Sequence, residues 1–153
     1  MTLPPAVIIH GLPHAALALA PGRTVLLLSA PGAASYAGAA WWRALVAAAL
    51  AGHPGRLEPD ALDCADAPGR ALEALSVGCK LVVLHPGPAW ADIAARAAGL
   101  GAALLPSAPA ALDLGRRGAE RRLPAWLASH MDAAGSPGAE LGQAHRDSRG
   151  PIG

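Results

Sequence analysis

Residues 24–52 read TVLLLSAPGAASYAGAAWWRALVAAALAG, and this stretch carries the plainest structural pattern in the chain. The apolar run between Thr24 and Ser29 predicts a strand buried on both faces, which is typical of a central strand in a parallel sheet. A Ser-Ala-Pro-Gly turn follows at 29–32. A helix is then predicted from Ala34 or Ser35 to Ala51, because Gly52 and Pro54 supply a stop. Strand, turn and helix in this order form the unit from which we infer the fold.

The preceding and following segments repeat this unit. Short apolar runs predict further strands at 6–10, 61–64, 80–85 and 101–105, separated by helical segments at 13–20, 68–78 and 88–99. Alternating strands and helices favour a parallel sheet joined by right-handed crossovers. The predicted fold class is therefore α/β: a three-layer sandwich, Rossmann-like or flavodoxin-like in the broad sense. Its mainly parallel sheet has about five strands, with helices on both faces.

The carboxyl-terminal part has a different character. The segment from Ser107 to Gly115 predicts a loop, and residues 115–131 predict a peripheral helical segment that carries four arginines and Trp126. Residues 132–153 show no apolar period, which predicts a flexible tail. The chain is accordingly divided into an α/β domain at 1–114, the helical segment at 115–131 and the tail at 132–153.

Composition excludes several classes of protein. Hydrophobic residues make up 53% of the 153 residues and the net charge is +1, with no basic stripe for a phosphate backbone. We expect no nucleic-acid partner, and no membrane partner because no long apolar run is uninterrupted. The amino terminus has no basic region before an apolar segment, so a cytoplasmic protein is expected. Cys64 and Cys79 lack CxxC spacing and are expected to be reduced, buried thiols.

The candidate site lies where the predicted strands end, because open parallel sheets bind ligands at their carboxyl edge. We expect His10, Asp63 and His85 to be the catalytic candidates, with a carboxylate of Asp63 or Asp66 orienting a histidine for acid–base chemistry. The ligand-binding candidates are Ser29, Gly32, Asp66 and Ser107. The Ser29–Gly32 turn would offer backbone N–H groups to an anion at the start of a helix.

Each candidate also has a purely structural interpretation. Strand ends are polar in many α/β proteins, and Asp66 stands where an N-cap for the helix at Pro68 belongs. No dinucleotide fingerprint, P-loop or GxSxG elbow is present, so no cofactor is identified. A metal site is not expected, because a turn and Pro13 separate His10 from His14 and remove the helical same-face argument.

Two functions remain open from the sequence. The first is a small α/β domain that binds a small anionic ligand at the carboxyl edge of its sheet and that could be catalytic. The second is a non-catalytic domain that forms a homo-oligomer or another protein contact through the Trp41/Trp42 helix or the Trp126 segment.

Overall fold

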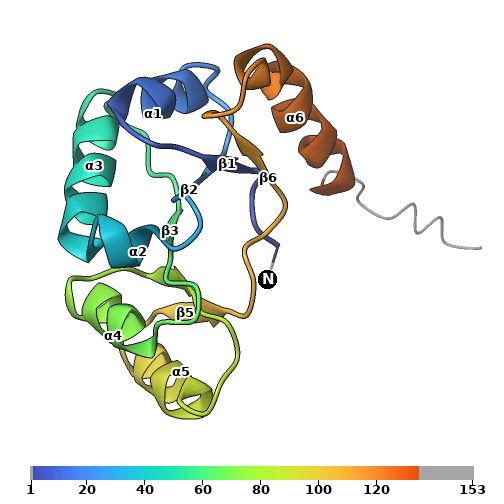
Figure 1. The fold of residues 1–153 in the computed structure, drawn as a ribbon. Helices are drawn as coiled ribbons and strands as arrows, with labels where there is room; N and C mark the ends of the chain where they lie inside the picture. The colour runs from blue at the N-terminus through green and yellow to red at the C-terminus, as the bar shows by residue number, and fades with distance from the viewer. Residues whose placement is uncertain (1, 135–153) are drawn as a thin grey trace, which may run out of the picture.

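The structure is a computed structural model that describes residues 2–134. Its six strands are β1 (Ala6–Ile8), β2 (Leu26–Leu28), β3 (Asp60–Asp63), β4 (Leu81–Val83), β5 (Ala103–Leu105) and β6 (Ala111–Asp113). The helices are α1 (Leu12–Leu19), α2 (Ala33–Tyr36), α3 (Ala39–Ala51), α4 (Pro68–Ser76), α5 (Trp90–Gly99) and α6 (Ala119–Ala134). All strands pair in parallel, in the order β5-β4-β3-β2-β1-β6. Figure 1 shows α1 to α5 along one side of this sheet and α6 beside β6. The predicted α/β class and carboxyl-terminal helix are confirmed.

The interior of the sheet agrees with the apolar pattern of the sequence. Strands β2 and β4 are buried at every position, and each has neighbours on both sides. A large hydrophobic cluster joins alternate strand residues to the buried faces of the helices, with Trp42 and Leu127 among its fully buried members. A second, smaller cluster contains strand residues of the other face: Ala6, Leu26, Leu28, Ala61, Leu81 and Val83.

The predicted loop from Ser107 to Gly115 is wrong in part, because it contains strand β6. The chain returns from β5 to the opposite edge of the sheet, where Ala111, Leu112 and Asp113 pair with Ala6, Val7 and Ile8 of β1. A strand of three residues is too short to show a period, so its pairing with β1 is decided by tertiary packing. The sheet therefore has six strands instead of about five.

Two helical predictions also need correction. The single helix predicted up to Ala51 is divided into α2 and α3 at Gly38, whose φ of 90° is left-handed. The last helix begins at Ala119 and continues through Pro124, so Asp132–Ala134 of the predicted tail belong to it. The remaining tail residues, 135–153, lie outside the described part of the chain. No helix within residues 2–134 has the length and hydropathy needed to cross a bilayer.

Cys64 and Cys79 are both free thiols and are at most 1% exposed, as expected from the sequence. Burial raises the pKa of Cys64 to about 12, with smaller contributions from the negative charges of Cys79, Asp63 and Glu73. Burial likewise raises the pKa of Cys79 to about 11. The thiolate is the reactive form of cysteine, so both side chains are inert in the folded protein.

We therefore predict that a thiol-specific disulfide reagent modifies neither cysteine of the native protein in mildly alkaline buffer. The same reagent should titrate two thiols after denaturation in guanidinium chloride, which serves as the internal control. Rapid modification of one thiol under native conditions would contradict the buried placement.

Candidate functional site

The carboxyl ends of the six parallel strands lie along one edge of the sheet, so the predicted site residues share that edge. The strand order places His10 after β1, Ser29 after β2, Asp63 at the end of β3 and His85 after β4. Neighbouring strands lie about 4.8 Å apart, so the strands that carry His10 and His85 are separated by about 14 Å. The edge therefore divides into a β1/β6 part, a β2/β3 part and a β4 part.

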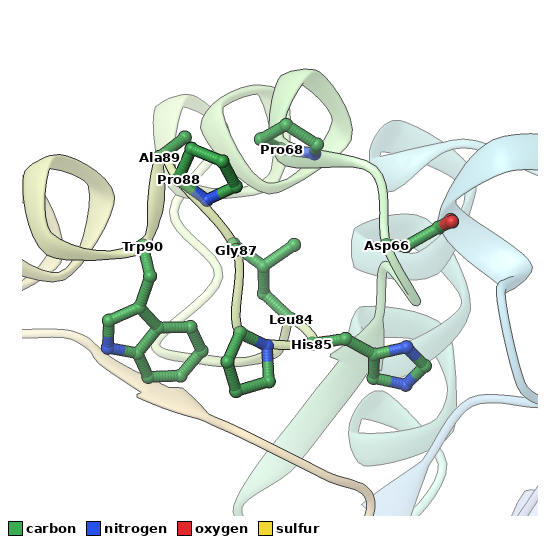
Figure 2. Close-up of a pocket in the computed structure, with 9 residues that line it drawn as sticks. Asp66, Pro68, Leu84, His85, Gly87, Pro88, Ala89 and Trp90 are labelled. Carbon is green, nitrogen blue, oxygen red and sulfur yellow. The ribbon is translucent and has the colours of Figure 1, made fainter.

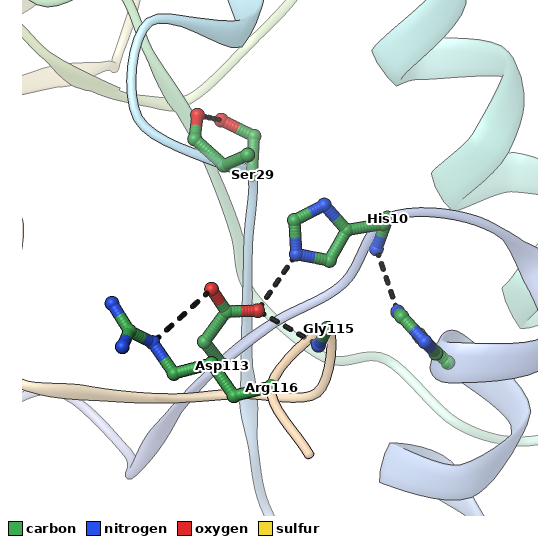
Figure 3. A network of polar contacts seen from close by, with 7 residues as sticks. His10, Ser29, Asp113, Gly115 and Arg116 are labelled. Carbon is green, nitrogen blue, oxygen red and sulfur yellow. Dashed lines mark hydrogen bonds and ion pairs between the residues drawn. The ribbon is translucent and has the colours of Figure 1, made fainter. Parts of the chain in front are cut away.

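His10 forms its side-chain contact with Asp113, at the end of β6. The Nε2 atom of His10 lies 2.7 Å from Oδ1 of Asp113, and the two side chains are 40% and 23% exposed. Figure 3 shows the imidazole meeting the carboxylate in front of the strands. This contact follows from the pairing of β1 with β6, in which Ile8 and Asp113 are partners. The carboxylate bonded to His10 is thus Asp113, and neither Asp63 nor Asp66 contacts this histidine.

Gly115 closes the pair from one side. Its backbone N–H donates to Oδ1 of Asp113 at 2.8 Å, and a Cβ at this position would lie 2.8 Å from Nε2 of His10. The guanidinium of Arg116 adds an ion pair, with Nε 4.0 Å from Oδ2 of Asp113. Burial raises the pKa of Asp113, but the hydrogen bonds from His10 and Gly115, with the charges of His10 and Arg116, lower it below the ordinary value overall.

His14 supports the same part of the edge from α1. The backbone N–H of His10 donates to Nδ1 of His14 at 3.1 Å, and the two rings lie edge to face with centroids 5.4 Å apart. An imidazole that accepts at Nδ1 carries its proton at Nε2 when it is neutral. His14 therefore holds the turn after β1 and limits the path of the backbone that carries His10.

The β2/β3 part of the edge is held together by internal hydrogen bonds. The hydroxyl of Ser29 accepts from the backbone N–H of Asp63 at 2.8 Å. The carboxylate of Asp63, only 4% exposed, accepts from the N–H of Gly32 at 3.2 Å and of Ala65 at 2.8 Å. The N–H of Gly32, one of the donors that the Ser29–Gly32 turn would offer to an anion, is therefore occupied by a carboxylate of the same chain.

The β4 part of the edge contains a pocket of about 450 Å³ (Figure 2). His85 and Asp66 both line it, so the structure brings these two predicted residues together, while His10 is not in the lining. Asp66 does not cap α4, because Ala67 holds the N-cap position and no side chain bonds to the first turn. Ser107 is exposed beyond the end of β5 and lies outside the lining of this pocket.

Metal coordination has no geometric basis in this part of the chain. Across residues 2–129, no three histidine, cysteine, aspartate or glutamate side chains gather closely enough to hold a metal ion. Along the edge the described residues present a histidine–carboxylate pair, a neighbouring guanidinium and a separate pocket.

Replacing Gly115 with alanine is predicted to separate His10 from Asp113, because the new methyl group would meet the imidazole. Losing the hydrogen bond should raise the pKa of Asp113 towards its ordinary value, as measured by carboxyl carbon NMR over a pH series. Gly69→Ala is the matched control, since no atom lies within 4 Å of a Cβ there. An unchanged Asp113 titration in Gly115→Ala would contradict this account.

Asp113 is the functional candidate that sequence reasoning missed, because it stands in a segment predicted as a loop. The available signal was the Asp-Leu-Gly sequence at 113–115, which follows a short apolar run as other polar residues do at the strand ends. Comparison of the chain with protein-family models, with curated proteins and with solved structures finds no significant match.

Proposed function

We propose that the His10–Asp113 pair is the acid–base centre of a small-molecule site whose ligand is a small anion. The observation that carries the proposal is the 2.7 Å contact between Nε2 of His10 and Oδ1 of Asp113, closed by Gly115. The pair lies at the carboxyl edge of a parallel sheet, where ligands of such sheets bind. Both side chains keep part of their surface open to a ligand.

Each group then has a different task. Asp113 remains ionised because its pKa is lowered, so it accepts the proton of Nε2 and holds the imidazole in one orientation. The Nδ1 atom of His10 has no hydrogen-bond partner among residues 2–129 and is left to take a proton from a ligand or to give one. The imidazolium that forms is stabilised by the carboxylate at its other nitrogen.

Positive charge beside the pair favours an anionic ligand. Arg116 is paired with Asp113 only at 4.0 Å, and 79% of its side chain is exposed. A guanidinium presents several donors in one plane and is suited to carboxylate or phosphate groups. Arg116 would therefore contact the charged group of the ligand while His10 acts on a neighbouring atom.

Inorganic phosphate is a suitable probe for this site. We expect phosphate to shift the imidazole NMR signals of His10 and the guanidinium signals of Arg116, with saturation on one binding curve. Arg116→Gln should weaken binding about tenfold, which is the usual effect of losing one charge-assisted hydrogen bond. Arg70→Gln, which removes an exposed arginine of α4, is the matched control. Equal weakening by both substitutions, or no saturable shift at His10, would refute the site.

The pH dependence of stability offers a separate prediction for the same pair. A carboxylate whose folded pKa is lowered contributes stability above its unfolded pKa of about 3.9 and loses it as pH falls through the folded value. Asp113 should therefore be fully stabilising at neutral pH. In His10→Gln the pKa of Asp113 should rise and this contribution should decrease, as measured by urea unfolding across a pH series. Identical curves for both proteins would contradict a His10–Asp113 bond.

The alternative function, an oligomer-forming domain, can use less of the Trp41/Trp42 helix and the Trp126 segment than the sequence suggests. Trp42 is fully buried in its own chain, and the indole N–H of Trp126 donates to the carbonyl of Ala6 at 2.9 Å. An oligomer contact would therefore use Trp41 and Tyr36, which are 39% and 70% exposed. Light scattering of Trp41→Ser against the unmodified protein tests this: only a change in mass would favour the alternative.

A further inference from the structure

The pocket beyond β4 is distinct from the His10–Asp113 pair and calls for a different ligand. Its volume of about 450 Å³ lies in the range of small-molecule sites. Three proline rings, those of Pro68, Pro86 and Pro88, line it together with the indole of Trp90. Such walls are flat and rigid, so they fit a ring without losing side-chain freedom on binding.

The pocket is polar at one end only. Figure 2 shows Trp90 at one end of the group and His85 and Asp66 at the opposite end. Neither of these two side chains has a hydrogen-bond partner among residues 2–129, and both residues are exposed. A ligand that matches this division has a ring at one end and a polar group at the other.

The start of α4 and the start of α5 both contribute to the lining, and helix amino termini ordinarily favour anions. Here most of the backbone donors are absent or already used. Pro68, Pro86 and Pro88 have no N–H group. The N–H groups of Leu84, His85 and Trp90 donate to the carbonyls of Leu105, Ala65 and Gly87. Of the nine lining residues, three therefore retain a backbone N–H without an acceptor among residues 2–129: Asp66, Gly87 and Ala89.

The lining of the pocket includes one carboxylate, that of Asp66, and no lysine or arginine. Asp92, in the first turn of α5, lines an adjoining recess that shares Pro68 and Ala89, and Arg96 lies one turn further along. A carboxylate at the polar end of the pocket attracts a cationic group, and the indole at the other end offers an apolar surface to a ring.

We propose that this pocket binds an arylalkyl amine, with the aromatic ring between Trp90 and the prolines and the protonated amine directed at Asp66. The proposal does not depend on the anion site, because it uses strands and helices at the other part of the edge. It assigns a ligand-binding role to the exposed carboxylate of Asp66, and to Trp90 a role beyond its packing against the hydrophobic core.

The test uses the full chain and three probes that share a benzene ring: 2-phenylethylamine, 2-phenylethanol and 3-phenylpropionate. Amide NMR spectra should show saturable shifts at residues 84–90 for the amine, with about tenfold weaker binding of the alcohol and weaker binding still of the carboxylate. Ethylamine, which lacks the ring, should cause no saturable shift. Asp66→Asn should weaken binding of the amine about tenfold and leave the alcohol unaffected.

Trp90→Leu should weaken binding of all three aryl probes, and circular dichroism establishes that it is folded. If Trp90→Leu does not fold, Asp66→Asn and the probe series still decide the result. Equal affinity for amine and carboxylate, or shifts elsewhere than residues 84–90, would overturn the proposal. Phosphate binding is measured from shifts of His10 and Arg116, and amine binding from shifts of residues 84–90. The two proposals can therefore fail independently.

Discussion

Trp42→Ala is expected to lower the free energy of unfolding by about 3–5 kcal/mol, which is the usual cost of truncating a buried tryptophan. Trp42 has 0% exposure and is the largest of the fully buried side chains among the described residues. It joins α3 to the main hydrophobic cluster, and its Nε1 donates to Oδ2 of Asp60 at 2.8 Å. The substitution thus leaves a large cavity. It also removes a hydrogen-bond donor from the partly buried carboxylate of Asp60.

Trp41→Ala is the matched control, because it removes the same side chain one residue away. Trp41 is 39% exposed, and its ring lies 6.2 Å from that of Trp42, so a loss of about 1 kcal/mol is expected. Urea unfolding followed by circular dichroism measures both. Since small domains are stable by only about 5–15 kcal/mol, Trp42→Ala should also shift the thermal midpoint markedly. Equal losses in the two variants would show that burial of Trp42 is not what stabilises α3.

Asp63→Ala is expected to lower the free energy of unfolding by about 2–6 kcal/mol. The carboxylate accepts from Gly32 and Ala65, and its removal leaves two backbone N–H groups without an acceptor at a cost of about 1–3 kcal/mol each. Ala65 is the only described residue other than glycine with a positive φ, at 49°. The Asp63–Ala65 bond supports this strained turn, in the manner of an Asx turn.

Two control variants test whether the stability depends on the hydrogen-bond acceptor of Asp63, on its charge, or on any carboxylate in this turn. Asp63→Asn keeps an oxygen acceptor and should lose about 1 kcal/mol or less, whereas Asp66→Ala changes an exposed carboxylate of the same turn and should have little effect. Phosphate binding at His10 and Arg116 should survive in Asp63→Ala if the variant folds. Loss of phosphate binding, with stability unchanged, would give Asp63 a direct part in the ligand site.

The α/β class was predictable because each strand and helix carries its own local pattern. The run VLLL at 25–28 and the stop at Gly52 are local signals that tertiary packing does not reverse. The errors arose where packing decides the conformation. β6 exists because β1 offers it a partner, and α6 continues through Pro124, which a local interpretation places in a first turn.

For the site, too, local sequence patterns were informative, and the features that depend on tertiary packing were not predictable. The parallel sheet implied that His10, Asp63 and His85 share one edge, and they do. Which of them meet depends on strand order, and the sequence carries no local signal for it. Ser29, Gly32 and Asp63 bond to one another, whereas His10 pairs with Asp113 across a separation of 103 residues.

The pairing of β6 with β1 also bears on the order in which the protein folds. A chain synthesised as far as residue 105 has all of β1 to β5, yet β1 then forms the outer edge of the sheet with one side of its backbone unpaired. Domains fold from the amino terminus as synthesis proceeds, so this edge closes only when residues 111–113 arrive. His10 gains its contact with Asp113 in that same step, so the His10–Asp113 pair is the last part of the edge to assemble.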